Sequence, residues 1–318
     1  MVIFIGSFLA AIVLGAADTS LQSVWLAFTT DDTSDTITIL RELRIPRVVA
    51  AMVVGAALSV AGAIMQGITR NPLADPGLLG LTAGANLALA VALAFIPSTN
   101  YFTTMLICFV GAAVGALLVF GIGTAKKGGL SPFRIVLAGA AVTAFLTAIA
   151  DAIGIYFKVS KDVSMWTSGG LIGTTWEQLS IIFPFIVVGI LVAILYSRQL
   201  TVLSLNEEVA VGLGQKIGRV KVVLFIVIIF LTGAAVALVG NMVFIGLMIP
   251  HIVRAIVGTD YRVILPFTAI TGAAFMMLAD LTGRIINAPY ETPVAAIMAI
   301  LGLPFFLLII HRGGKAFS

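Results

Sequence analysis

The feature that most constrains this chain is a series of long apolar runs, separated by short segments that contain charges, glycine or proline. A membrane-spanning helix needs about 20 consecutive apolar residues, whereas a strand of a membrane barrel needs about 10 residues of alternating polarity. The runs here are rich in Ala, Leu, Ile and Val and do not alternate. Because backbone polar groups inside a bilayer must be bonded within the protein, the runs predict an all-α, polytopic membrane protein.

Composition supports this fold class. Hydrophobic residues make up 60% of the chain and charged residues 10%, against roughly 45–50% and about 25% in soluble domains. The net charge is +4, but the basic residues lie in short loops between apolar runs. That placement is typical of membrane topology, so we expect a lipid bilayer and no nucleic acid as partner. Cys108 is the only cysteine, so an internal disulfide is excluded.

We predict about ten spans in a single transmembrane domain over residues 1–318. They cover residues 2–17, 46–66, 79–96, 102–124, 133–157, 179–198, 221–238, 242–257, 263–282 and 294–311. The third and eighth are short, which predicts segments that are tilted or broken within the membrane. Residues 2–17 lack the basic N-terminal region of a signal peptide, so we expect a retained first helix.

Ten spans place both termini on one side of the membrane, and the basic residues indicate which side. With cytoplasmic termini, 12 of the 18 Lys and Arg residues fall on the cytoplasmic side, as the positive-inside rule requires. The six exceptions, on the outer side, are Arg41, Arg44, Arg47, Lys158, Lys161 and Arg284.

An internal repeat is also visible. Residues Gly55, Gly62, Pro72 and Gly80 recur 178 residues later as Gly233, Gly240, Pro250 and Gly258. The second and seventh spans are five helices apart, so the two copies are expected to cross the membrane in opposite senses. Inverted repeats of this kind are typical of transporters, although glycine is also abundant wherever helices pack closely.

Residues 44–80 combine a helix start, a packing surface and a sharp turn. Pro46 suits the first turn of a helix, where its missing N–H is not needed. Small residues between Gly55 and Ala63 allow close approach of a neighbouring helix. The Asn-Pro and Asp-Pro-Gly steps at residues 71–77 cannot continue a helix, so the chain must turn there.

This stretch resembles the signature of the FecCD-type permeases, which serve ABC importers of iron-siderophores, haem and vitamin B12. The resemblance extends over almost the whole chain. It rests on R-x-P-R at residues 44–47, N-P-L-A-D-P-G-L-L-G at residues 71–80, the loop near residue 207 and the closing segment at residues 279–284.

The resemblance implies a dimeric permease in a prokaryotic plasma or inner membrane, with its pathway at the dimer axis. Its partners would be two cytoplasmic ATPase subunits, an extracytoplasmic binding protein and a second permease subunit, identical or related. The sequence lacks the P-loop motif G-x-x-x-x-G-K-S/T. We therefore expect no enzyme activity and no cofactor in this chain, with ATP-Mg bound by the partner subunits.

The loop at residues 203–219 is too polar to span the membrane. Asn206 can cap a short helix, Glu207 and Glu208 suit its first turn, and Gly212 or Gly214 can end it. The resemblance implies that this is the coupling helix that docks on the ATPase; the alternative is an ordinary solvated connector. The residues assigned to coupling are Asn206, Glu207, Glu208, Ala210, Gly212, Leu213 and Gly214.

Three of the outer arginines are candidates for docking the binding protein. The resemblance implies that Arg44, Arg47 and Arg284 meet glutamates on its two lobes, and arginine suits such bidentate pairing. The alternative is local pairing, of Arg44 with Glu42 or Asp35 and of Arg284 with Asp280 at i, i−4.

Polar residues inside the apolar runs are candidates for lining the pathway. We assign Gln66 and Asn86 to this role, with hydrogen bonding between helices as the alternative. Neither His251 nor His311 has a Cys or carboxylate nearby in the sequence at ligand spacing, so no metal site is expected.

The expected function is translocation of an iron-siderophore-type chelate, with haem or cobalamin as alternative cargo. Two rival functions remain: a secondary transporter coupled to ions through Asp151 or Asp280, and a membrane scaffold or sensor that transports nothing.

Overall fold

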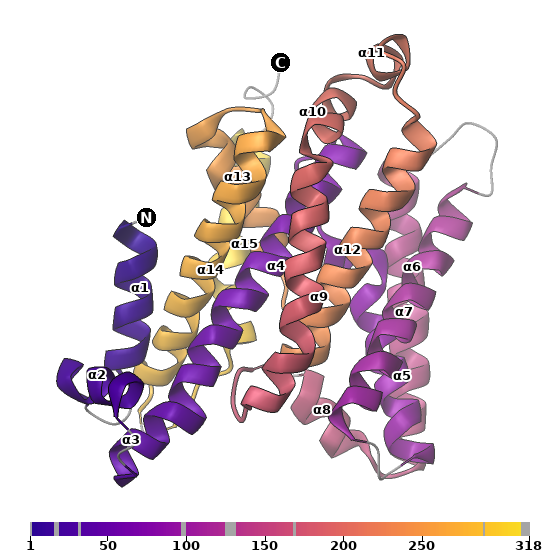
Figure 1. Ribbon diagram of the computed structural model, residues 1–318. Coiled ribbons are helices and arrows are strands. Elements are labelled where there is room, and N and C mark those ends of the chain that lie inside the picture. Colours follow the sequence, from indigo (N-terminus) through magenta and orange to yellow (C-terminus); the bar gives the residue numbers. More distant parts are fainter. Residues whose placement is uncertain are drawn as a thin grey trace.

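The computed structural model describes residues 2–15, 19–30, 33–96, 100–124, 132–167, 170–288 and 290–312, which are helices joined by short turns (Figure 1). The helices are α1 (Val2–Val13), α2 (Leu21–Thr29), α3 (Asp35–Ile39), the π-helix η1 (Leu40–Arg44), α4 (Ile45–Thr69), the 3-10 turn η2 (Pro76–Leu79), α5 (Leu81–Phe95), α6 (Tyr101–Thr124), α7 (Pro132–Tyr156), α8 (Ser160–Thr167), α9 (Trp176–Leu195), α10 (Ser197–Leu205), α11 (Glu207–Gly212), α12 (Ile217–Val239), α13 (Ile245–Val257), α14 (Tyr261–Ile285) and α15 (Val294–Arg312).

The predicted all-α polytopic fold is confirmed. Six stretches, which contain α4, α6, α7, α9, α12 and α14, are long and apolar enough to cross a membrane. The shorter apolar helices α1, α5, α13 and α15 lie on the four remaining predicted spans. The first helix ends at Val13, and residues 16 and 17 of its predicted span lie outside the described part of the chain.

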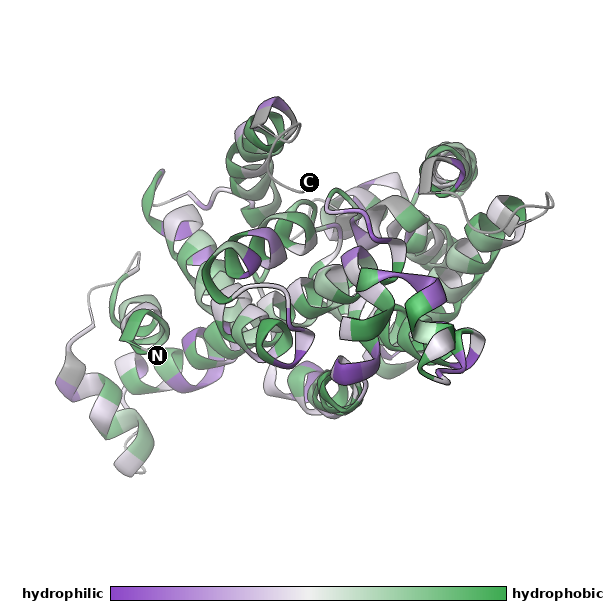
Figure 2. Ribbon diagram, turned by 90° about the horizontal axis from the view of Figure 1, so that it is seen from above, coloured by the Kyte–Doolittle hydropathy of each residue, from purple (hydrophilic) through white to green (hydrophobic). Residues whose placement is uncertain are grey.

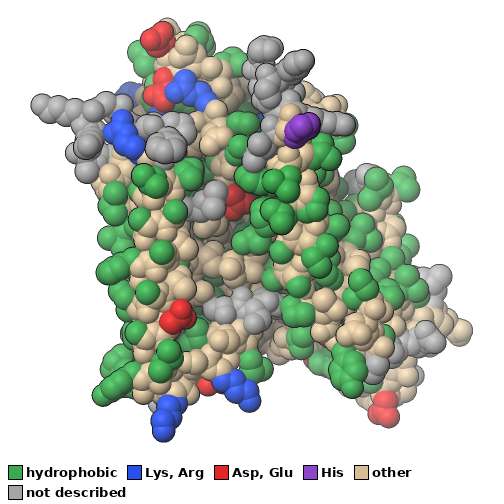
Figure 3. All heavy atoms as spheres, turned by 180° about the vertical axis from the view of Figure 1, so that it is seen from behind, with side chains coloured by type: hydrophobic (Ala, Val, Ile, Leu, Met, Phe, Trp, Pro, Cys, Tyr) green, Lys and Arg blue, Asp and Glu red, His purple; other side chains and the backbone are tan. Residues whose placement is uncertain are grey.

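The surface is that of a membrane protein. Hydrophobic residues occur on all sides of the bundle, including the outermost helices (Figure 2), and hydrophobic side chains cover its middle while Lys and Arg side chains lie at its two ends (Figure 3). The start of α1 and the end of α15 lie toward the end of the molecule that carries α11, and α2, α3 and α8 lie at the opposite end (Figure 1). We call these the α11 end and the α2 end.

Helix α4 is the centre of the bundle. Together with α3 and η1 it forms one helical stretch, Asp35–Thr69, and 83% of the most apolar part of this stretch is buried inside the protein. Its small residues allow the close packing that the sequence predicts: a side chain at Gly62 would collide with the backbone carbonyl of Gly246 in α13. The π-helical turn, which holds Arg44, was not predicted, because its sequence does not differ from that of an ordinary helical turn.

The opposite senses predicted for the two repeat copies are present in α4 and α12. Glu207 bonds both Arg70, just beyond the end of α4, and Lys221, near the start of α12, so the two helices run antiparallel. Local structure then diverges, because α4 continues through Gly62 whereas α12 stops before Gly240.

Candidate functional site

Two breaks in the helical pattern meet inside the bundle. Residues 70–80 separate α4 from α5, and residues 240–244 separate α12 from α13. The breaks follow α4 and α12, which belong to the two repeat copies, but they are not equivalent, because the counterparts of residues 240–244 are residues 62–66 within α4. They produce the short helices α5 and α13 that the sequence predicted. They also approach one another, because a Cβ placed on Gly246 would lie 3.1 Å from Pro76 and 3.4 Å from the Asp75 carboxylate. Non-helical backbone at such depth is tolerated only where it is buried in protein or lines a water-filled cavity.

A cavity of about 470 Å³ opens at these breaks. Its polar lining consists of Asp75, Thr82, Asn86, Thr143, Thr147 and Asn241. Phe244 and Phe306 face it as well, with ring centroids 6.5 Å apart. Phe244 has φ of 68°, a conformation that an aromatic residue rarely adopts.

Most of this lining is apolar, and its polar groups are mainly neutral hydroxyls and amides. Among the described residues that line the cavity, Asp75 is the only ionisable one. Its Oδ1 accepts the N–H of Gly77 at 2.7 Å. The buried Oδ1 of Asn86 has no hydrogen-bond partner in the described structure.

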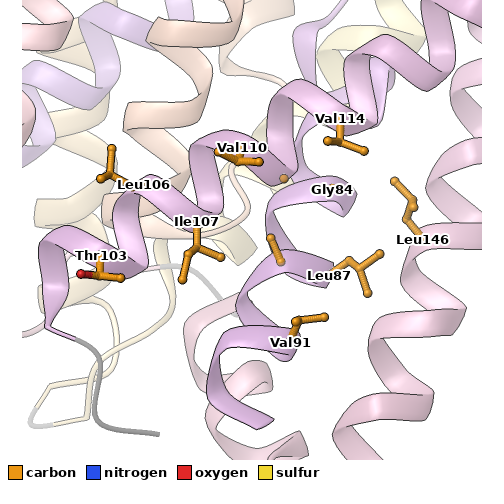
Figure 4. A pocket seen from close by; sticks show the side chains of 11 residues that line it. Gly84, Leu87, Val91, Thr103, Leu106, Ile107, Val110, Val114 and Leu146 are labelled. Atoms are coloured by element: carbon orange, nitrogen blue, oxygen red, sulfur yellow. The ribbon is translucent and has the colours of Figure 1, made fainter. Parts of the chain in front are cut away.

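A second cavity, of about 430 Å³, differs in kind. It lies between α5, α6 and α7 and is lined by apolar side chains such as Leu87, Ile107 and Leu146, with Thr103 at one end (Figure 4). Leu106 and Val110 on its rim are exposed on the outer surface of α6. The cavity is therefore a groove toward lipid, without the polar groups that a hydrophilic solute needs.

Of the two predicted pathway residues, only Asn86 lies at the first cavity. Gln66 is 2% exposed between α4 and α13. Its amide donates to the carbonyl of Leu247 at 3.1 Å, and its oxygen accepts from Arg254 at 2.8 Å. Gln66 thus bonds one helix to another, which is the alternative role considered for it from the sequence.

Sequence reasoning missed Asp75, Thr82, Thr143 and Thr147 as cavity residues. Thr143 and Thr147 carried a usable signal, because polar residues four apart lie on one face of a helix. Asp151, a candidate for ion coupling, is exposed on α7 one turn beyond Thr147 and is not among the residues that line the cavity.

The outer arginines gather at the α2 end, where α4 begins and α14 finishes. Arg47 is bonded to two carboxylates: Nε and Nη2 lie 2.9 and 2.8 Å from Asp280 Oδ1, and Nη1 donates to both oxygens of Glu291 at 2.8 and 2.9 Å. Arg284 Nε lies 3.1 Å from Asp280 Oδ2, so the i, i−4 pair considered in the sequence is present.

Arg44 and Arg284 are buried against the last turn of α1. Arg44 Nη1 donates to the carbonyl of Ile12 at 3.0 Å and to Thr19 Oγ1 at 2.6 Å. Arg284 Nη2 donates to the carbonyl of Ala11 at 2.9 Å. Two cations therefore satisfy carbonyls at a helix C-terminus, where the helix dipole favours positive charge.

The loop at residues 203–219 forms the helix expected of it. The Asn206 side chain accepts the N–H of Glu208 at 2.9 Å, which caps α11. Gly214 adopts φ of 75°, and the N–H groups of Gly214 and Gln215 bond the carbonyls of Val211 and Ala210 in a Schellman ending. Ala210 is buried, whereas Val211 and Leu213 are exposed.

Helix α10 holds this loop to the rest of the bundle. Thr201 donates to Asp260, the residue that caps α14. Hydrogen bonds from Arg262 lower the pKa of the Asp260 carboxyl to about 2. The carboxylate therefore stays charged at physiological pH, and this link does not change with pH there.

Comparison with known proteins agrees with this architecture. A model of the FecCD transport family matches residues 3–312. The chain is 46% identical to the iron(3+)-hydroxamate import system permease protein FhuB of Bacillus subtilis (strain 168), over 97% of this chain and 80% of that protein. It is 36% identical to the ferric enterobactin transport system permease protein FepD of Escherichia coli (strain K12), over 95% and 90%.

A solved structure described as an inward-facing metal-chelate type ABC transporter has a TM-score of 0.84 and 24% identity, covering 98% of this chain and 97% of that one. At this identity the likeness supports the fold. The family match over nearly the whole chain goes further, and on that ground the chain belongs to the FecCD transport family.

Proposed function

We propose that this chain is the membrane-spanning permease subunit of an ABC importer that moves an iron-siderophore-type chelate across a prokaryotic plasma or inner membrane. The observation that carries the proposal is the cavity at the two helix breaks. Broken helices at the interface of inverted repeats are where transporters of many folds bind their cargo. The relatives named for ferric hydroxamate, ferric enterobactin and ferric citrate favour an iron chelate. Relatives named for hemin and cobalamin keep those as alternative cargo.

The cavity supports translocation better than tight binding. Hydroxyl and amide groups alternate with aromatic and aliphatic ones around it, so a bulky chelate meets few strong anchors. Helices α7 and α15, which contribute to the lining of the cavity, also carry exposed apolar residues such as Leu137 and Leu307, which suit a second permease subunit. A pathway between two such subunits would be wide, with selection of the cargo left to the binding protein.

Helix α11 is proposed as the contact for the ATPase. It projects from the α11 end (Figure 1), and its exposed Val211 and Leu213 offer an apolar surface to a partner. Glu207 in α11 forms ion pairs with both Arg70 and Lys221. A displacement of α11 by the ATPase would therefore be transmitted to α4 and α12 through these pairs. The α11 end, with both termini, would then face the cytoplasm, and the arginine cluster would face outward.

Docking of the binding protein is proposed at Arg44, Arg47 and Arg284. Arg47 has the largest accessible surface of the three, at 11% exposed. Arg44 and Arg284 would become available only if the last turn of α1 moved, because its carbonyls now occupy them.

The test is reconstitution. The chain, its ATPase and its binding protein in proteoliposomes should take up a radiolabelled ferric hydroxamate when ATP is supplied, and an uncoupler should have no effect. A secondary transporter would stop when the ion gradient is removed, and a scaffold would move nothing. Transport by the purified chain without the ATPase would overturn the proposal.

Ion coupling has little support from the two acidic residues considered for it. Asp280 is held between Arg47 and Arg284, so it is not free to exchange a cation. Asp151 is exposed on α7 outside the lining of the cavity.

A further inference from the structure

The hydrogen-bonding capacity of Arg47 is almost fully used within the chain. A guanidinium has five N–H donors in a fixed plane. Nε and Nη2 are directed to Asp280, and Nη1 is directed to Glu291. A second carboxylate cannot bind bidentately unless one of these two leaves, because one N–H of Nη2 is too few for it.

The two carboxylates differ in how readily they can leave. Asp280 is 1% exposed and already pairs with both Arg47 and Arg284. If it released Arg47, it would gain neither contact with water nor a new cationic partner. Glu291 is 33% exposed and bonds Arg47 on the solvent side of the cluster. Glu291 can therefore release Arg47 into water at low cost, and Asp280 cannot.

The backbone next to Glu291 is held by its own hydrogen bond, independently of the contact between the Glu291 side chain and Arg47. The N–H of Thr292 donates to the carbonyl of Gly283 at 2.9 Å, which ties this segment to the last turns of α14. A rotamer change of Glu291 is then sufficient to free Nη1, without rearrangement of α14 or α15.

We propose that Glu291 is an internal competitor for the carboxylate of the extracytoplasmic partner: it occupies Nη1 of Arg47 in the free permease and leaves when the partner docks. The inference rests on the proposed docking role of Arg47. Asp280 is the positioning residue, because it keeps the guanidinium oriented during the exchange. One charge-assisted pair replaces another, so the affinity for the partner reflects the difference in free energy between the new pair and the Arg47–Glu291 pair that it replaces. The affinity therefore stays moderate, which favours release after each cycle.

The first measurement needs no partner. The full permease–ATPase complex in nanodiscs is treated with phenylglyoxal, which modifies accessible arginines, and Arg47 is followed by peptide mass spectrometry. Glu291→Gln and Glu291→Ala should raise the modification rate of Arg47 severalfold. Glu177→Gln is the matched control, because Glu177 is an exposed acid at the α2 end, in the first turn of α9. Thermal unfolding of each variant verifies that it is folded.

The second measurement uses the binding protein that restores uptake in the reconstituted system. Both Glu291 variants should bind it roughly threefold to tenfold more tightly than the original chain at low salt, and the difference should shrink at high salt. Glu177→Gln should not show this gain.

The outcomes separate the two claims. Unchanged modification of Arg47 in both folded Glu291 variants, or modification that rises with no gain in affinity, overturns the competition. If Arg47→Ala also leaves the affinity of the original chain unchanged, the docking role proposed for Arg47 fails with it. If Arg47→Ala weakens binding while the Glu291 variants show no gain, only the competition is wrong.

Discussion

At the scale of single residues, Asp280 has the most demanding environment. Its carboxylate is 1% exposed and faces Arg47 and Arg284 together. Taking charges out of water costs several kcal/mol each, and the cost is recovered only while all partners remain. The cluster therefore depends on Asp280 more than on any of its arginines, because it joins two of them.

Replacing Asp280 should be strongly destabilising. Asp280→Asn leaves two buried guanidinium groups facing a neutral amide, and breaking a buried pair in this way costs about 3–5 kcal/mol. We expect a clearly lowered midpoint of thermal unfolding for the purified chain in detergent. Asp151→Asn, which removes an exposed acid on α7, is the control. Equal midpoints for the two variants would contradict this account of the cluster.

Residue-scale features differ in how far the sequence predicts them. The Asn206 cap and the Gly214 ending of α11 depend on neighbours a few residues away, so the local sequence predicts both. Gln66 depends on Arg254, which is remote in sequence, and no local pattern indicates that partner. Arg44 and Arg284 stand out by charge, but their partners on α1 are backbone carbonyls, which every residue has.

At the scale of elements, the helix breaks and the packing of α4 determine the site. The turn motif at residues 71–80 predicts the first break directly. The second break begins at Gly240, whose counterpart Gly62 lies within the continuous α4, and the counterpart of Pro72 is Pro250, inside α13. The repeat therefore does not indicate the second break; the gap between the predicted spans 221–238 and 242–257 does. The position of the cavity could not be predicted, because it depends on α7 and α15 packing beside both breaks.

The close contact between α4 and α13 should not tolerate a side chain. Gly62→Val should reduce thermal stability and yield, because the added carbons would collide with the Gly246 carbonyl in a packed interior. Gly121→Val in α6 is the comparison, since a Cβ there meets nothing within 4 Å. Similar unfolding midpoints for both variants would show that the α4–α13 distance is not constrained as described.

Helix α11 allows a test of coupling that is independent of stability. A Cβ on Gly212 meets nothing within 4 Å, so Gly212→Phe should leave the unfolding midpoint of the isolated chain unchanged. The same ring would lie on the proposed ATPase contact and should abolish co-purification of the ATPase. Gly218→Phe, equally open and near the start of α12, should retain the ATPase. Retention by the Gly212 variant would argue for an ordinary connector.

At the scale of the whole molecule, the two cavities make opposite predictions about water. With Cys108 replaced by alanine, Thr147→Cys should react with a charged, membrane-impermeant thiosulfonate, because Thr147 lines the polar cavity. Val110→Cys on the apolar groove should react slowly, since that groove faces lipid. Labelling is read by mass shift in proteoliposomes. Faster labelling at residue 110 than at residue 147 would contradict this assignment, because it would mean that water reaches the apolar groove more readily than the polar cavity.

The continuity of α4 has a consequence for how sequences of this kind can diverge. Helix α4 runs for roughly 38 Å from Arg44 and Arg47 at its start to Arg70, the partner of Glu207, just beyond its end. Inserting one residue between them would rotate the two ends by about 100° relative to each other. Insertions and deletions should therefore be excluded from α4, which should keep its residue count in related sequences.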